Sequence, residues 1–290
     1  MLERVTPKYR IPRTVFSGRA ETEGDGIEVR RLIGVPELDM VDPFLLLDVF
    51  SVNPQEGRSA GVPPHPHRGF ETVTYLLAGQ IRHVDSAGHE SLLQSGGVQW
   101  MTAGRGVVHS EMPETTAGSV AGFQLWVNLP RSHKMTDASY QEFDSDEIPV
   151  EERGSQVTVK VIAGTTGRGT TGPVRQPLTE PRYFDFDLGA GAAVVEPVPS
   201  DHNAFIYMIN GSLEFPGDDL SVHPLGGETF AVLSHGTELR VSAGADGARF
   251  LLVSGRPLRE TVARSGGFVM NTLSEVHAAQ EDFRRGRLAG

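Results

Sequence analysis

Short apolar runs, separated by turn-forming residues, recur along the first part of the chain. Residues 44–50 (FLLLDVF), 72–79 (TVTYLLAG) and 123–129 (FQLWVNL) are examples, and the pattern extends from Thr14 to about Trp126. Apolar runs of this length, bounded by turn signals, are typical of buried β-strands. The first half of the chain is therefore predicted to form a domain of short strands.

A polar, acidic stretch interrupts this pattern at residues 131–154, and strand signals resume at residues 157–162 (VTVKVI). The segment Tyr75-Leu-Leu-Ala-Gly79 returns as Tyr207-Met-Ile-Asn-Gly211, which indicates two domains of similar architecture. We therefore expect an N-terminal β domain, a connection and a C-terminal β domain, with boundaries at residues 1–135, 136–154 and 155–290.

The end of the chain changes from strand spacing to helical spacing. Thr272 and Glu275 have the separation of a capping box, in which two side chains satisfy backbone groups at a helix start. Val276, Ala279 and Phe283 follow at helical intervals. We predict one helix at about residues 273–287, which belongs to the C-terminal domain and packs this apolar stripe on a barrel.

Composition narrows the class of protein. The 290 residues include 34 Gly and 19 Pro, which suits short strands joined by tight turns. The absence of Cys excludes disulfides and thiolate ligands, and no apolar run is long enough to span a membrane. The N-terminal decapeptide MLERVTPKYR has no apolar core typical of a signal peptide. We therefore expect a cytoplasmic protein without membrane contact.

The formal net charge of −11 argues against direct binding of DNA or RNA, because phosphate contacts dominate nucleic-acid affinity. Arg284, Arg285 and Arg287 form the one basic cluster, and positive charge is favourable near a helix C-terminus. Any role in transcription should therefore depend on a protein partner.

Two pairs of metal-competent side chains stand out, since one residue separates His65 from His67 and one residue separates His109 from Glu111. Alternate side chains of an extended strand point to the same face. If the two strands lie opposite each other, three imidazoles and one carboxylate converge on one point. The pattern thus predicts a metal site.

Three neutral imidazoles and one carboxylate suit a borderline divalent metal such as Fe, Mn, Ni, Co or Zn. Calcium is disfavoured because it prefers oxygen ligands. An octahedral ion held by four side chains keeps two positions for water, dioxygen or a bidentate substrate, whereas tetrahedral zinc would be saturated.

Longer motifs extend this interpretation to most of the chain. Together they resemble the pirin family: DPFLLLDVF (42–50), PPHPHRGFETVTYLLAGQI (63–81), QWMTAGRGVVHSEMPE (99–114), FQLWVNLP (123–130) and GRPLRETVARSGGFVMNT (255–272). The resemblance implies an all-β bicupin of two cupin-type antiparallel β-barrels, with one metal in the N-terminal barrel. The family's ligands fall on His65, His67, His109 and Glu111. One departure is Gly267, where the family usually has proline, and it should affect only local loop stiffness.

Pirins have been described as iron-containing proteins, as quercetin 2,3-dioxygenases and as regulatory proteins that bind partners. The resemblance implies one divalent transition metal, Fe(II) in the first place, with Ni, Mn, Co, Cu or Zn as alternatives. As an enzyme, the chain would open a flavonol such as quercetin with O₂ and release CO, with Glu111 as the catalytic acid–base group. As a regulator, it would bind a partner protein in a metal- or redox-dependent way without catalysis.

Other polar residues are expected to have structural roles. Glu71 lies at the position where many metal cupins place a carboxylate ligand, but the pirin pattern favours Glu111. Arg68 and Arg105 should form loop-fixing ion pairs, and Trp100 should pack in the core. Alignment of the two copies of the internal repeat places Pro197, Pro199, Leu239 and Val241 at the positions of the four ligands. The second barrel should therefore be metal-free. We expect no ligand among the remaining histidines, which are His83, His89, His133, His202, His223, His235 and His277.

Overall fold

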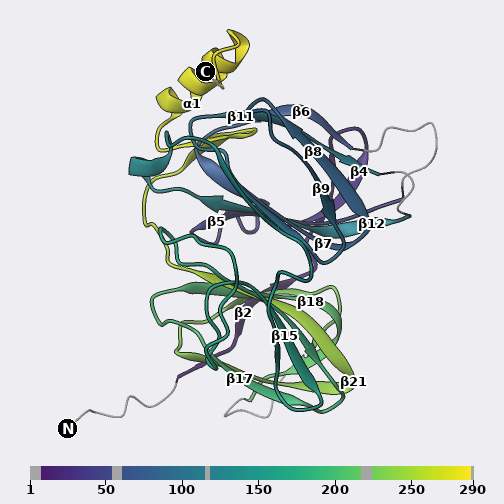
Figure 1. Cartoon of the computed structure of the whole chain (residues 1–290). Coiled ribbons are helices and arrows are strands. Elements are labelled where there is room, and N and C mark those ends of the chain that lie inside the picture. Colours follow the sequence, from purple (N-terminus) through teal and green to yellow (C-terminus); the bar gives the residue numbers. More distant parts are fainter. Residues whose placement is uncertain (1–7, 54–60, 115–117, 217–223, 289–290) are drawn as a thin grey trace. The chain divides into compact units, whose positions relative to one another are not determined.

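The computed structural model describes residues 8–53, 61–114, 118–216 and 224–288 (Figure 1). These residues form two compact units, each described here by itself. The N-terminal unit contains the described part of residues 19–147 and 258–290, and the C-terminal unit contains the described part of residues 1–18 and 148–257. Each unit is built from strands, and the described residues contain one α-helix, α1 (Leu273–Arg284).

Two facing antiparallel sheets form most of the N-terminal unit. The larger has seven strands, in the order β13 (Ser139–Phe143), β10 (Val98–Thr102), β7 (Phe70–Ala78), β12 (Val120–Asn128), β5 (Phe44–Val52), β4 (Ile27–Ile33) and β3 (Arg19–Glu23). The smaller has four, in the order β6 (Val62–His67), β11 (Val107–Pro113), β8 (Gln80–Asp85) and β9 (Glu90–Gln94). A hairpin of β22 (Ala263–Ser265) and β23 (Phe268–Met270) precedes the helix.

The C-terminal unit has one ten-stranded sheet that curves around its own apolar core. Its strands are β1 (Tyr9–Arg10), β2 (Pro12–Phe16), β14 (Val150–Glu152), β15 (Val157–Ala163), β16 (Arg182–Leu188), β17 (Ala193–Pro197), β18 (Asn203–Glu214), β19 (Leu225–Gly226), β20 (Phe230–Leu233) and β21 (Glu238–Gly255). All pairings are antiparallel except the short one between β1 and β21. The long β21 connects much of the sheet, because β16, β17 and β18 all pair with it.

The predicted all-β fold of two cupin-type units with a C-terminal helix is confirmed. The strand signals of the sequence correspond to real strands: residues 44–50 lie in β5, residues 72–78 in β7 and residues 157–162 in β15. The sheets remain open at their edges, so each unit is a barrel-like sandwich instead of a closed barrel.

The N-terminal segment belongs to the C-terminal unit, and the C-terminal segment belongs to the N-terminal unit. This assignment differs from the expected boundaries at residues 135 and 155. Strands β1 and β2 near the N-terminus pair with β21 and β20 of the C-terminal unit. Residues 258–288 belong to the N-terminal unit, where α1 lies against β22 and β23. Sequence position alone assigned these segments to the wrong neighbours, because contacts between chain ends depend on strand pairing and not on distance along the chain.

The helix begins as its capping box predicts. Thr272 accepts a hydrogen bond from the Glu275 backbone, and the Glu275 side chain accepts one in return. Val276 and Ala279 are buried in an apolar cluster with Phe268, Met270 and Leu288. The helix ends at Arg284, three residues before the predicted end, and Gly286 follows in the left-handed region with φ of 66°. Glycine is favoured there because it lacks the Cβ clash that L-residues suffer.

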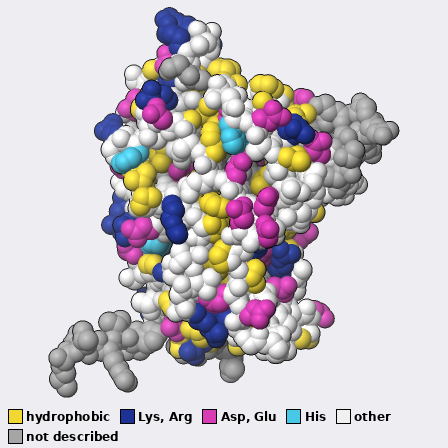
Figure 2. Space-filling view, in the orientation of Figure 1, with side chains coloured by type: hydrophobic (Ala, Val, Ile, Leu, Met, Phe, Trp, Pro, Cys, Tyr) yellow, Lys and Arg dark blue, Asp and Glu magenta, His cyan; other side chains and the backbone are white. Residues whose placement is uncertain are grey.

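Charges of both signs are interspersed with apolar side chains on the face seen in Figure 2. Within the described residues, no helix is long and apolar enough to cross a membrane.

Candidate metal centre

Strands β6 and β11 position the two predicted ligand pairs beside each other. They pair in antiparallel register, with His65 opposite His109 and His67 opposite Val107. A bulge then shifts the register, so that Glu111 lies opposite Val62. Bulges change the direction of a side chain and are frequent beside functional sites. Three of these side chains, those of His67, His109 and Glu111, are buried.

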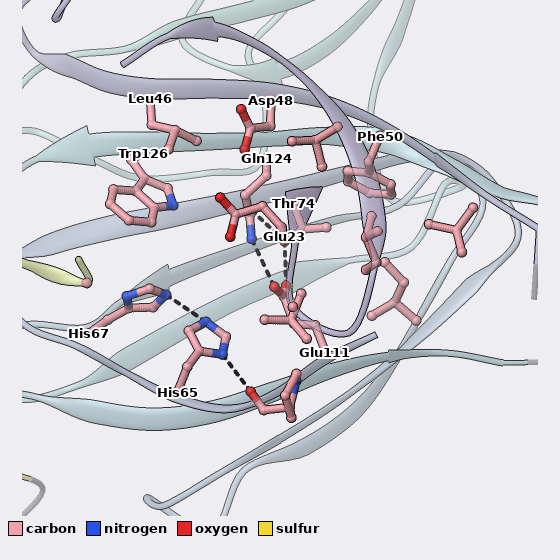
Figure 3. A pocket seen from close by; sticks show the side chains of 18 of the residues that line it. Glu23, Leu46, Asp48, Phe50, His65, His67, Thr74, Glu111, Gln124 and Trp126 are labelled. Carbon is pink, nitrogen blue, oxygen red and sulfur yellow. Dashed lines mark hydrogen bonds between the residues drawn. The ribbon is translucent and has the colours of Figure 1, made fainter. Parts of the chain in front are cut away.

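The three imidazoles form a tight cluster. Their candidate ligand atoms lie within 4.8 Å of one another, and the Nε2 atoms of His65 and His67 are 3.0 Å apart (Figure 3). Two nitrogen ligands at about 2.1 Å from one ion, and at a right angle to each other, are about 3.0 Å apart. The spacing therefore fits two neighbouring ligands of one metal ion.

The hydrogen bonds of the cluster leave nitrogen atoms available for an ion. The Nδ1 atom of His65 is 2.9 Å from the Pro63 carbonyl oxygen and donates to it, so Nε2 keeps its lone pair. The Nε2 atom of His109 is buried without a hydrogen-bond partner among the described residues, as is Nδ1 of His67. An unpaired buried nitrogen is costly, and a metal ion would satisfy that of His109.

Burial keeps His67 and His109 in the neutral form that metal ligation requires. Desolvation lowers the pKa of His67 well below its usual range, and the neighbouring His65 lowers it further. Desolvation, followed by the nearby His67, His65 and His83, likewise lowers the pKa of His109. Neutral imidazoles present a lone pair to a cation without charge repulsion.

Glu111 is held by two donors. The Thr74 hydroxyl donates to Oε1 and the Gln124 amide donates to Oε2, each at 3.0 Å. Figure 3 shows Thr74 and Gln124 directed at this carboxylate from the facing sheet. Glu111 falls in a second metal-competent group with His109 and His83, and not in the group of His65, His67 and His109. His109 thus links the carboxylate to the imidazole cluster.

Glu71 has a different environment from Glu111. It is buried on β7, where it accepts a hydrogen bond of 2.8 Å from Thr102. Neither of the two metal-competent groups found among the described residues contains it. Glu71 therefore bonds a neighbouring strand and lies outside both candidate metal-binding groups.

The two arginines and Trp100 have the structural roles that the sequence suggested. Arg68 forms an ion pair of 2.9 Å with Asp282 of α1, and Arg105 forms one of 2.9 Å with Asp137. Trp100 is 1% exposed and belongs to the core.

The sequence reasoning missed the place of His83. This side chain is 1% exposed and lies on β8, where it is opposite Glu111 of β11. Its Nδ1 atom is 3.4 Å from Nδ1 of His109. The signal that could have revealed it is the spacing of His83 and Asp85, which places both on one face of a strand.

The remaining histidines lie apart from the cluster. His133, His235 and His277 are exposed, and His89 bonds Glu142. His202 is buried in the C-terminal unit, where it lies 3.4 Å from the Ser254 hydroxyl. His223 lies outside the described residues.

Apolar side chains occupy the ligand-equivalent positions of the C-terminal unit. Leu239 and Val241, the equivalents of His109 and Glu111, are buried in its core. Pro197 on β17 lies opposite Glu238, one position from Leu239, whereas His65 lies directly opposite His109. Leu239 itself lies opposite Glu196, a buried carboxylate that is ion-paired with Arg153. The four ligand-equivalent positions of this unit therefore carry no metal-competent side chain.

A cavity of about 400 Å³ lies between the two sheets of the N-terminal unit and reaches the cluster (Figure 3). Such a volume is typical of a small-molecule site. His65, His67 and Glu111 line it together with the aromatic side chains of Phe50 and Trp126. The remaining apolar lining consists of Ile27, Val29, Leu46, Val52, Val62, Pro63, Pro64, Ile81 and Pro113.

Three further charged side chains, those of Glu23, Arg31 and Asp48, also line the cavity. Arg31 forms a two-pronged ion pair with Asp48, at 2.7 and 2.9 Å, and also contacts Glu23. Burial raises the pKa of Asp48, and the Arg31 guanidinium opposes this change. The cavity is therefore lined mainly by apolar side chains, and its polar lining includes the metal-competent groups and the ion pairs of Arg31.

A barrel-like unit with a histidine-rich cluster beside an apolar cavity, followed by a second unit without it, defines the class of metal-site bicupins. The model of the pirin family matches residues 26–127, and that of the pirin C-terminal cupin domain matches residues 183–289. The chain belongs to the pirin family.

Similar proteins cover nearly the whole chain. A pirin-like protein of Caulobacter vibrioides is 46% identical over 94% of this chain and 97% of its own length. A Pseudomonas aeruginosa protein, provisionally named quercetin 2,3-dioxygenase, is 42% identical over 97% of this chain and 99% of its own length. The crystal structure of a quercetin 2,3-dioxygenase from Acinetobacter baumannii superposes with a TM-score of 0.87 at 32% identity, covering 98% of this chain and 99% of that one.

Proposed function

We propose that this protein is a metal-dependent dioxygenase that opens flavonols such as quercetin with O₂ and releases CO. The observation that carries the proposal is the position of the imidazole cluster on an apolar cavity large enough for a three-ring aromatic molecule. The relatives that bear the name quercetin 2,3-dioxygenase support the same substrate class.

His65, His67, His109 and Glu111 would hold the metal, as the donor set and the spacing of the imidazoles suggest. Fe(II) is the first choice, and Ni, Mn, Co, Cu and Zn are the alternatives for this mixture of ligands. When bound, such an ion supplies Lewis-acid attraction for a chelating phenolate and a place for O₂.

The side chains of the cavity would prepare the substrate. Phe50 and Trp126 offer flat apolar surfaces for the flavonol rings, and the aliphatic lining excludes water. Glu111 is the carboxylate of the proposed ligand set, so it would accept the proton of the 3-hydroxyl group. Thr74 and Gln124 would hold its two oxygens in place for this transfer.

Turnover by the reconstituted protein tests the proposal. The chain is treated with chelator, reloaded anaerobically with each candidate metal and mixed with quercetin and O₂. We expect about one ion per chain, loss of the visible quercetin absorption, O₂ uptake and CO. The His65→Ala variant should be inactive, because one ligand is lost, while the exposed His277→Ala control should retain activity.

A protein that binds one ion per chain but leaves several flavonols unchanged would contradict the enzyme proposal. Binding of a partner protein by only one iron oxidation state would then support the regulatory alternative. The cytoplasmic location stays a prediction.

A further inference from the structure

A row of buried polar side chains leads away from the metal cluster through β8. His83 and Asp85 alternate on this strand and lie opposite Glu111 and His109 of β11. The Nδ1 atoms of His83 and His109 are 3.4 Å apart, and Nε2 of His83 is 3.3 Å from Oδ2 of Asp85. Both side chains of the His83–Asp85 pair are 1% exposed or less.

The carboxylate at the end of this row is firmly held. Oδ1 of Asp85 accepts hydrogen bonds from the backbone N–H groups of Ala87 and His89, at 2.7 and 3.0 Å. Oδ2 accepts the hydroxyl of Tyr140 on β13. Asp85 is therefore fixed as an acceptor toward His83.

This arrangement determines where each proton resides. An ionised carboxylate can only accept, so Nε2 of His83 must carry the proton that it donates to Asp85. A neutral imidazole has one protonated nitrogen, so Nδ1 of His83 must accept the hydrogen bond from Nδ1 of His109. The proton of His109 is then on Nδ1, and its Nε2 atom, buried without a partner, keeps a lone pair.

We propose that His83 and Asp85 are positioning residues that hold His109 in the tautomer and ring orientation needed for metal binding. The proposal rests on the metal site proposed above, but not on flavonol turnover. Partners of metal-ligating histidines commonly change metal affinity by about 10- to 100-fold when they are mutated.

The Asp85→Asn variant tests the proton assignment without removing the side chain. The amide oxygen can keep the bonds from Ala87 and His89, which directs the amide NH₂ toward His83. His83 then accepts at Nε2 and donates from Nδ1, so the proton of His109 moves to Nε2. We expect at least a tenfold rise in the Kd for Co(II), measured by chelator competition. The matched control is Asp137→Asn, whose carboxylate is exposed.

Nitrogen NMR of histidine-labelled, metal-free protein reads the tautomer directly. We expect Nδ1 protonation of His109 in the wild type and Nε2 protonation in Asp85→Asn. His83→Ala should weaken Co(II) binding, and His83→Gln should recover part of it, because an amide oxygen can accept from His109. Thermal unfolding checks that each variant is folded.

Two results would overturn the proposal: Nε2 protonation of His109 in the metal-free wild type, or a Kd of Asp85→Asn within twofold of that of the wild type. A protein that shows the expected tautomers and affinities but does not convert quercetin would contradict only the proposed enzyme activity.

Discussion

At the scale of single residues, two buried carboxylates of the N-terminal unit have separate environments. Glu111 lies beside His109, whereas Glu71 bonds Thr102. We expect Glu111→Gln to weaken metal binding at least tenfold, about 1.4 kcal/mol, because a negative ligand is lost. Glu71→Gln should have a smaller effect. Metal titration of both variants measures the difference, and the reverse order would move the ligand role to Glu71.

Gly267 is another residue whose importance appears only in three dimensions. A Cβ atom added there would lie 2.0 Å from the Pro66 carbonyl oxygen and 2.5 Å from Nδ1 of His67. The departure from the family's proline therefore concerns a neighbour of His67, a proposed ligand, and not loop stiffness alone as the sequence suggested.

We expect Gly267→Ala to displace His67 or the β22–β23 hairpin, and so to lower both metal affinity and the thermal midpoint. Chelator competition and thermal unfolding provide the two measurements. The control is Gly226→Ala, since an added Cβ meets nothing within 4 Å there. Equal metal affinities of the Gly267 variant and the wild type would show that the β22–β23 hairpin moves to accept the Cβ atom without changing the metal site.

At the scale of elements, α1 depends on its capping box and on its contact with the β22–β23 hairpin. We expect Thr272→Ala to lower the free energy of unfolding by about 0.5–2 kcal/mol, because the backbone N–H of Glu275 loses its acceptor. Denaturant titration measures this change. Ser274→Ala, at an exposed position of the same helix, is the control and should change stability little. Equal losses in the two variants would exclude capping as the cause.

At the scale of the whole molecule, stability should decline in acid. Burial lowers the pKa of His202 to about 4, with Arg182, Arg256 and Arg10 acting in the same direction and Asp201 opposing them. An unfolded histidine has a pKa of about 6.5. Below pH 6.5 the unfolded chain binds a proton that the folded chain excludes, so stability falls as the pH decreases toward 4.

Thermal midpoints between pH 7 and pH 4.5 measure this dependence. Between pH 7 and pH 4.5 the thermal midpoint of His202→Gln should fall less than that of the wild type, whatever the variant's midpoint at pH 7. Parallel curves for the two proteins would show that other groups cause the acid sensitivity.

The sequence by itself determined the features that depend on local spacing. Alternating and continuous apolar runs predict strands such as β5 and β7, because side-chain direction repeats every two residues. The capping box predicts the start of α1 for a similar local reason. The spacing of His65 with His67, and of His109 with Glu111, identified the candidate ligands before the strands were paired.

Only the tertiary structure decided which distant residues become neighbours. It placed α1 with the N-terminal unit, His83 beside His109 and Gly267 against His67. These contacts join residues that are far apart along the chain, and they depend on strand register and on a bulge in β11. The apolar pattern of a strand indicates which of its faces is buried, and so restricts its register, but it does not show which other strand it pairs with.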